Sequence, residues 1–116
     1  MVFDQRSKYG AYRTQVDGIV FDSRKEARYY SELKLLVKGG EVEKFDMQVP
    51  YVLQEGFHHK ACKRKVMPII YIADFVVYYK DGHTEVVDVK GFRTKEYLLK
   101  KKMLLHLYPD MNFKEV

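Results

Sequence analysis

The sequence predicts a single α/β domain spanning residues 1–116, with a central mixed β-sheet flanked by helices. Two observations lead to this prediction. Apolar and aromatic runs of strand length alternate with two segments of helical periodicity, and turn residues separate them. In addition, 47% of the residues are hydrophobic and 32% are charged. This composition suits one buried core in a globular chain, and no apolar run approaches the length of a membrane span.

The expected elements follow from these patterns along the chain. In order, they are a loosely held, flexible basic arm (1–13), a hairpin (14–21), a helix (23–38), four strands (42–47, 50–54, 69–79 and 84–89), a second helix (94–107) and an edge strand (111–116).

Local signals define the ends of the two helices. Ser23 and Glu26 have the spacing of a capping box, and Gly39-Gly40 supply the left-handed conformation that favours a helix end. Thr94 is a good N-cap for the second helix, which Pro109 ends. These signals place each helix between strand-like segments.

Turn chemistry and residue type define the strands. Asp17-Gly18 is a favoured two-residue hairpin turn. The segment 69–79 is rich in β-branched and aromatic residues and is expected to be buried on both faces. Residues 56–68 are basic and irregular, and we expect them to form a flexible loop.

Charge and cysteine content restrict the class of protein. The net charge is +5 and the sequence pI is about 9.2, which is consistent with a polyanionic partner. The single Cys62 has no internal disulfide partner, and the first residues lack the pattern of a secretory signal. We therefore expect a cytoplasmic protein.

Two strands carry carboxylates among apolar residues, where an unpaired charge is costly. Asp88 and Lys90 are two residues apart and project from one face. The position of Asp74 depends on the loop between the strands. A two-residue loop (81–82) would place it on the opposite face, whereas a three-residue loop (80–82) would place it beside Asp88.

A pair of carboxylates on neighbouring strands has two interpretations. Oxygen ligands of this kind suit Mg²⁺ or Mn²⁺, which would polarise a phosphoryl oxygen while Lys90 stabilises developing charge. The structural alternative is an ion pair of Asp88 with Lys90, with Asp74 bonded to a backbone N–H.

The arrangement resembles the PD-(D/E)XK nuclease superfamily, in which D…(D/E)-x-K lies on a hairpin after a helix that carries Glu. The match includes Tyr71-Ile72-Ala73-Asp74-Phe75, Asp88-Val89-Lys90-Gly91-Phe92-Arg93-Thr94 and the segment 16–29. From about Lys8 to the C-terminus, the chain is similar to small phage-encoded endonucleases described as similar to Holliday-junction resolvases. The resemblance implies a restriction-endonuclease-like core.

The resemblance also implies roles for individual residues. Asp74 and Asp88 would be the paired metal ligands, and the carbonyl of Val89 would be a further ligand. Lys90 matches the catalytic lysine. Glu26 matches the helix glutamate that reaches the metal. This role competes with its part in the capping box with Ser23, because both roles need the same carboxylate. The superfamily proline is replaced at one position, where Ala73 precedes Asp74.

Several other residues are candidates for supporting roles. Gln48 belongs to a Gln-x-Pro segment that recurs in the family, and either supports the site or is an ordinary strand residue. Tyr71 either stacks or hydrogen-bonds near the site or is a buried core tyrosine, and the second role is expected. The residues expected to contact DNA phosphates are Lys60, Lys63, Arg64, Lys65, Arg93, Lys95, Lys101 and Lys102. His58, His59 and Cys62 lack a fourth ligand for zinc and are assigned to a surface loop.

The leading hypothesis is a Mg²⁺-dependent endodeoxyribonuclease, also supported by Mn²⁺, that cuts branched DNA in the cytoplasm of a phage-infected bacterium. Resolving a four-way junction requires two symmetric cuts and therefore implies a homodimer. The alternatives are a nicking or flap endonuclease of phage replication or packaging, a catalytically silent DNA-binding module, and a structural protein with a salt-bridged acidic pair.

Overall fold

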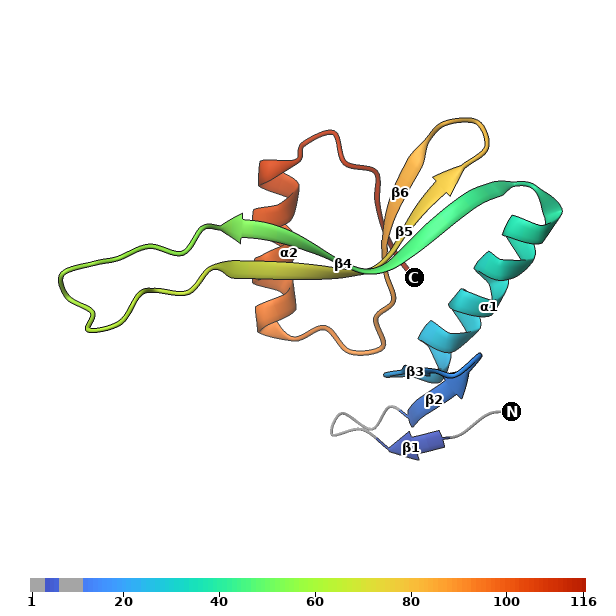
Figure 1. The fold of residues 1–116 in the computed structure, drawn as a ribbon, viewed down its shortest axis with the longest axis horizontal. Helices are drawn as coiled ribbons and strands as arrows, with labels where there is room; N and C mark the ends of the chain where they lie inside the picture. Colours follow the sequence, from blue (N-terminus) through green and yellow to red (C-terminus); the bar gives the residue numbers. More distant parts are fainter. Residues whose placement is uncertain (1–3, 7–11) are drawn as a thin grey trace.

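The computed structural model describes residues 4–6 and 12–116, and within these it contains two sheets and two helices (Figure 1). The elements are β1 (Asp4–Arg6), β2 (Tyr12–Val16), β3 (Ile19–Phe21), α1 (Arg24–Gly39), β4 (Val42–Gln54), β5 (Ile69–Tyr79), β6 (Thr84–Asp88), α2 (Lys95–Leu107) and β7 (Phe113–Glu115).

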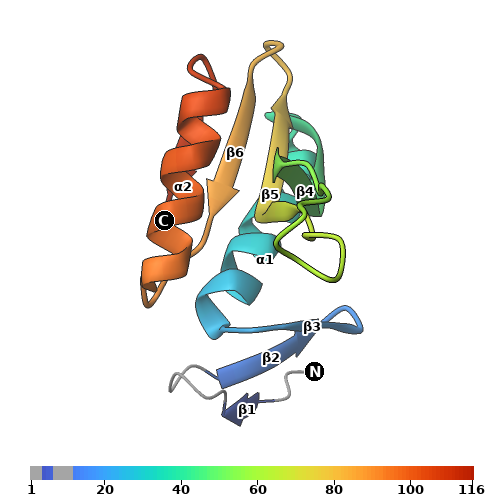
Figure 2. The same cartoon turned by 90° about the vertical axis from the view of Figure 1, so that its left-hand side faces the viewer.

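The larger sheet is mixed, as predicted. Its strand order is β4-β5-β6-β7, with antiparallel pairs except for β6 and β7, which are parallel and connected through α2. On β6, Val87 belongs to the core cluster under α1, whereas its neighbour Val86 belongs to the cluster under α2. Because successive strand residues point to opposite faces, the two helices cover opposite faces of this sheet (Figure 2).

The smaller sheet consists of β1, β2 and β3 beside the first turn of α1 (Figure 1). Its predicted hairpin turn is confirmed, with Asp17 and Gly18 at φ 53° and 77°. Within the segment expected to form a loosely held arm, residues 4–6 and 12–13 lie in paired strands. The rest of that segment lies outside the described residues.

Both predicted helix caps are confirmed. The Ser23 hydroxyl accepts the Glu26 N–H at 3.1 Å, and the Thr94 hydroxyl accepts the Tyr97 N–H at 3.0 Å. Gly40 ends α1 at φ 86°, in the left-handed region expected of a helix C-terminus. Among the described residues, neither helix has the length and apolar character needed to cross a membrane.

The prediction of separate strands at 42–47 and 50–54 is wrong, because β4 is continuous over Val42–Gln54. Gln48 lies in its middle at φ 54°, a conformation that breaks the sequence pattern without ending the strand. Pro50 is tolerated because β4 is an edge strand, where a missing N–H need not break the ladder.

The long β4–β5 hairpin changes its packing partner along its length. On β5, Tyr71 and Ala73 pack in the cluster under α2, whereas Phe75 and Val77 pack in the cluster under α1. These four are alternate residues of β5, and alternate residues point to the same face of a flat strand. Because they pack against different helices, the hairpin must twist between Ala73 and Phe75. Asp74 lies at the point where the change occurs.

The loop between β5 and β6 has three residues, 80–82. Tyr79 donates its N–H to the His83 carbonyl at 2.9 Å, and Gly82 at φ 98° donates to the Tyr79 carbonyl at 3.0 Å. Phe75 then pairs with Val87, and continuing this register by one residue places Asp74 opposite Asp88. Of the two loop alternatives, the structure contains the one that brings the carboxylates together.

We predict that Gly82→Ala lowers the free energy of unfolding by about 1–2 kcal/mol, because φ 98° is strained for a residue with a Cβ. Urea titration monitored by circular dichroism measures the change. Gly39→Ala is the control, since it lies at the end of α1 with open space around the added methyl group and is expected not to destabilise. Equal destabilisation by both variants would contradict the role assigned to the loop.

Candidate active site

The candidate active site lies where three strands and the first turn of α1 meet. Met47 pairs with Phe75 and Val49 pairs with Ala73, so Gln48 lies opposite Asp74 on β4. Asp88 lies on the other side of Asp74, at the end of β6. The tertiary structure thus aligns an amide and two carboxylates across neighbouring strands.

Asp88 is the most deeply buried of the candidate residues, with 1% of its surface exposed. Its Oδ2 accepts a hydrogen bond from the hydroxyl of Tyr71. Its Oδ1 lies 3.2 Å from Lys90 Nζ but makes no hydrogen bond of acceptable geometry with the residues that the structure describes. A buried carboxylate oxygen without a hydrogen bond is costly, so this atom is poised to accept a further cationic or donor group.

Asp74 is held by the chain that leaves β6. Its Oδ2 accepts the N–H of Val89 at 2.8 Å. Burial, and second the nearby charge of Asp88, raise the pKa of Asp74 to about 6 although the Val89 hydrogen bond acts to lower it. The charge of Asp88 therefore opposes the ionisation of Asp74.

Glu26 joins these carboxylates from α1. It is 7% exposed, and its Oε1 accepts a 3.4 Å hydrogen bond from Gln48 Nε2. Burial and the charge of Asp74 raise the pKa of Glu26 to about 8. In the predicted capping box, the Ser23 half is present, while the Glu26 side chain is directed to Gln48.

Lys90 supplies positive charge at the edge of this cluster. Its Nζ is close to Asp88 and lies 4.6 Å from the centre of the Tyr97 ring, a cation–π contact that holds it against α2. The side chain remains 28% exposed, which allows it to reach a ligand. One lysine faces three carboxylates, so the site carries a surplus of negative charge when all are ionised.

The fit of this site to a divalent cation rests on its donor set. In the described part of the chain, no group of three or more His, Cys, Asp or Glu side chains is positioned around a common point as a ready metal site. Nevertheless, the raised pKa values of Glu26 and Asp74 and the Asp88 Oδ1 that lacks a hydrogen bond are features that a bound cation would relieve. Carboxylate oxygens of this kind are the donors that Mg²⁺ and Mn²⁺ prefer.

The predicted DNA-contacting cations fall into two groups. Lys60, Lys63, Arg64 and Lys65 are all exposed on the loop between β4 and β5, which also carries the exposed His58, His59 and Cys62. In the second group, Lys95 and Lys102 are exposed on α2, whereas Arg93 and Lys101 contact Glu115 at 3.5 and 3.2 Å. The charges of Arg93 and Lys101 are therefore partly neutralised by Glu115 of β7.

Tyr71 is a buried tyrosine, as expected, and its hydroxyl also holds Asp88, which is the alternative role considered for it. Two further residues near the site, Tyr97 and Glu115, were not assigned a role from the sequence. Tyr97 donates its hydroxyl to Glu115 while its ring contacts Lys90. A buried tyrosine usually needs a hydrogen-bond partner for its O–H. The expected burial of Tyr71 therefore indicated that its hydroxyl has a partner, but not which residue the partner is.

We predict that Tyr71→Phe lowers the free energy of unfolding by about 1–3 kcal/mol, because Asp88 loses a donor while the ring is retained. Thermal and urea unfolding measure this loss. Tyr51→Phe is a matched control, since Tyr51 packs against Tyr71 and its hydroxyl makes no hydrogen bond within the described residues. A Tyr71→Phe protein as stable as the control would show that the contact contributes little.

We also predict that Glu26→Gln stabilises the metal-free protein more at pH 9 than at pH 5. Folding raises the pKa of Glu26 from 4.5 to about 8, so its stabilising contribution is present below pH 4.5 and is lost as pH rises through 8. Gln removes this dependence. The expected change in the difference between variant and wild type is at least about 1 kcal/mol, measured by unfolding in buffer with a chelator.

Glu32→Gln, an exposed substitution on the same helix, is the control for this experiment. A difference between Glu26→Gln and wild type that is the same at both pH values would contradict the electrostatic account of the cluster.

Comparison with curated proteins and with solved structures finds no match to this chain. A family model described as a protein of unknown function (DUF1064) matches residues 6–116, which include every candidate site residue. The match covers nearly the whole sequence. The chain therefore belongs to the DUF1064 family.

Proposed function

We propose that this protein is a metal-dependent endonuclease of the PD-(D/E)XK type that hydrolyses phosphodiester bonds in DNA. The observation that supports this most strongly is the cluster of Glu26, Asp74 and Asp88 beside Lys90, in which burial and nearby negative charge raise the pKa values of Glu26 and Asp74. Both contacts of the structural alternative are present, the ion pair of Asp88 with Lys90 and the Val89 N–H bond to Asp74. That alternative does not account for Glu26, which is buried and forms no ion pair with a residue that the structure describes. The mixed sheet flanked by helices suits a restriction-endonuclease-like core.

The proposed metal ligands are the carboxylates of Asp74, Asp88 and Glu26, with the carbonyl of Val89. A bound Mg²⁺ or Mn²⁺ would polarise a phosphoryl oxygen and lower the pKa of its water. The ligands themselves are held in place by Tyr71 on Asp88, Val89 N–H on Asp74 and Gln48 on Glu26. Such support from surrounding hydrogen bonds keeps ligands oriented.

Lys90 has the position to stabilise the charge that builds on the phosphate during attack by water. Its Nζ is held 3.2 Å from Asp88 and against the Tyr97 ring, so its place relative to the carboxylates is fixed. A preorganised cation next to the reacting group stabilises a transition state more than one that must move into place.

We further propose branched DNA as the substrate, cut by a homodimer in the cytoplasm of a bacterial host. Two symmetric cuts across a junction need two active sites related by a two-fold axis. This part of the proposal rests on the resemblance to junction resolvases and is tested separately from hydrolysis.

We predict that purified protein cuts labelled DNA with Mg²⁺ or Mn²⁺, and that Asp88→Asn and Lys90→Ala reduce the rate by about 10²–10³-fold. The substrates are a four-way junction, a matching linear duplex and a flap, incubated at low salt. Asp110→Asn, an exposed substitution in the turn after α2, is the control and should leave cleavage unchanged.

Paired symmetric nicks on the junction alone would support a resolvase. Cleavage of the flap or the duplex, but not of the junction, would support the nuclease proposal and contradict the junction as its substrate. Binding of DNA without cleavage of any substrate would overturn the nuclease and favour a catalytically silent DNA-binding module.

A further inference from the structure

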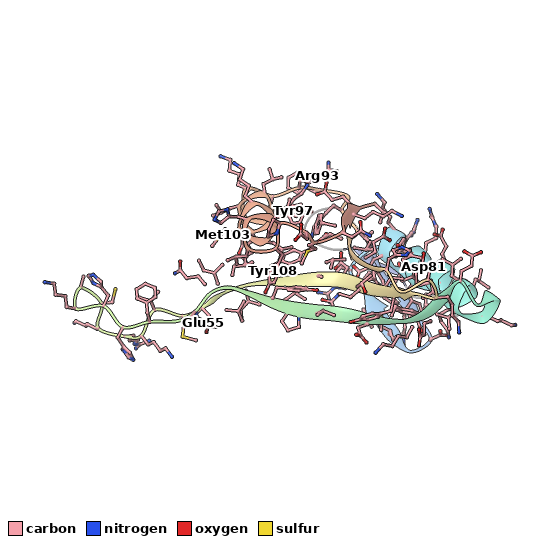
Figure 3. The ribbon with its side chains drawn as sticks, turned by 90° about the horizontal axis from the view of Figure 1, so that it is seen from above. Glu55, Asp81, Arg93, Tyr97, Met103 and Tyr108 are labelled. Carbon is pink, nitrogen blue, oxygen red and sulfur yellow. The ribbon has the colours of Figure 1, made fainter. Side chains whose placement is uncertain are left out.

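Residues 55–68, hereafter the finger, project from the body of the protein between β4 and β5. The two strands pair as far as Gln54 and Ile69, and Phe57 and Val66 continue the ribbon with mutual backbone hydrogen bonds of 2.9 and 2.7 Å. Figures 1 and 3 show this segment extending beyond α2, with Glu55 at its base. The finger is thus an extension of the sheet that contains the candidate active site.

Local contacts give the finger a defined path. A side chain at Gly56 would place a Cβ 3.0 Å from the Val66 carbonyl oxygen, so glycine permits the close approach of the two chains at the base. At the tip, Cys62 donates its N–H to the His59 carbonyl at 2.9 Å, and Ala61 donates to His59 Nδ1 at 3.0 Å. The predicted irregular loop therefore has a paired base and a hydrogen-bonded turn.

The charge of the finger has one sign beyond its base. Residues 56–73 contain no Asp or Glu, although charged residues make up 32% of the whole chain. The cations Lys60, Lys63, Arg64 and Lys65 are exposed, and none of them forms an ion pair with a residue that the structure describes. This differs from the second group of cations, in which Arg93 and Lys101 both contact Glu115. The tip is therefore a concentrated, uncompensated positive surface.

The distance between the tip and the site is set by strand geometry. Lys65 comes nine residues before Asp74, and β5 begins at Ile69, so a strand rise of about 3.3 Å per residue gives an upper bound of about 30 Å. The molecule is 54 Å along its longest axis, which lies along the finger in Figure 1. Along B-DNA, about 30 Å corresponds to about nine base pairs at 3.4 Å each.

We propose that the finger grips the backbone of duplex DNA up to about nine base pairs from the bond that is cut. This inference rests on the proposed nuclease function for the position of the cut. Because the finger emerges from the strand that carries Asp74, the sheet fixes the position of its base relative to the site. The substrate therefore includes up to about one helical turn of duplex beside the cleaved phosphate.

The distribution of side chains favours DNA over a membrane surface as the partner. A membrane-inserting finger would present large apolar side chains at its tip. Here the exposed Phe57 and Met67 lie at the base, and residues 58–65 at the tip are His, Lys, Ala, Cys and Arg. Phosphate contacts by such cations are independent of base sequence and depend strongly on salt.

The test compares two double variants that remove equal charge. Lys63→Ala/Lys65→Ala removes two cations of the tip, and Lys38→Ala/Lys80→Ala removes two exposed lysines at the end of α1 and in the β5–β6 loop. Fluorescence anisotropy measures binding to duplexes of 8, 16 and 24 bp over a range of salt, with EDTA present so that no cleavage occurs. Binding is thus measured independently of the nuclease activity.

On the 24-bp duplex, the salt slope of log Kobs is expected to become less steep by about 2 for the finger variant and to stay unchanged for the control. A longer duplex offers more binding positions, which alone raises the apparent affinity. For the wild type, the affinity for the 16-bp duplex should exceed that for the 8-bp duplex by more than this effect. The finger variant should lose most of that additional increase. If the wild-type protein shows these binding results but cuts none of the DNA substrates in the cleavage assay, the nuclease proposal is rejected and the finger is retained as a DNA contact.

The proposal is overturned if both variants change the slope equally, if neither does, or if affinity shows no added dependence on length. It is also overturned if the finger variant loses binding to vesicles containing phosphatidylglycerol while its DNA binding is unchanged.

Discussion

The register of the β5–β6 hairpin is the constraint on which the candidate site depends. A loop of three residues closed by Gly82 at φ 98° places Asp74 beside Asp88 rather than on the opposite face. A shift of one residue would exchange the faces of every side chain on β6. The repulsion between the two carboxylates is therefore imposed by the backbone, and the hydrogen bonds from Tyr71 and Val89 hold each one against it.

The second feature that shapes the site is the change in packing along β4 and β5. The hairpin packs against α1 on one side of Asp74 and against α2 on the other, so the site lies between two core clusters. Glu26 reaches it from α1, and the Tyr97 ring supports Lys90 from α2. Carboxylates at such a boundary are buried enough for raised pKa values yet remain within reach of the surface.

Local signals in the sequence predicted most of the fold, because turns and caps depend on a few adjacent residues. Asp17-Gly18, Ser23 and Thr94 form the turn and caps that their residue types predict. The continuity of β4 was missed because Gln48 adopts a positive φ that its residue type does not favour. No residue next to Gln48 indicates that conformation locally.

In the candidate site too, some features were predicted from the sequence and others depend on the folded structure. Asp74, Asp88, Lys90 and Glu26 were identified from a short pattern and a resemblance, and the structure brings them together. The contacts of Tyr71 with Asp88 and of Glu115 with Tyr97 depend on strand twist and on the parallel placement of β7, which arise only in the folded chain. The long finger likewise depends on how far β4 and β5 remain paired.

We propose that the carboxylates of Glu26, Asp74 and Asp88 bind a divalent cation. Isothermal titration calorimetry of Mn²⁺ into metal-free wild type, Asp88→Asn and Asp110→Asn tests it without any DNA. The account predicts that wild type and Asp110→Asn bind Mn²⁺ with the same affinity and that Asp88→Asn binds at least about 10-fold more weakly. Absence of binding to wild type, or equal binding by all three proteins, would contradict it.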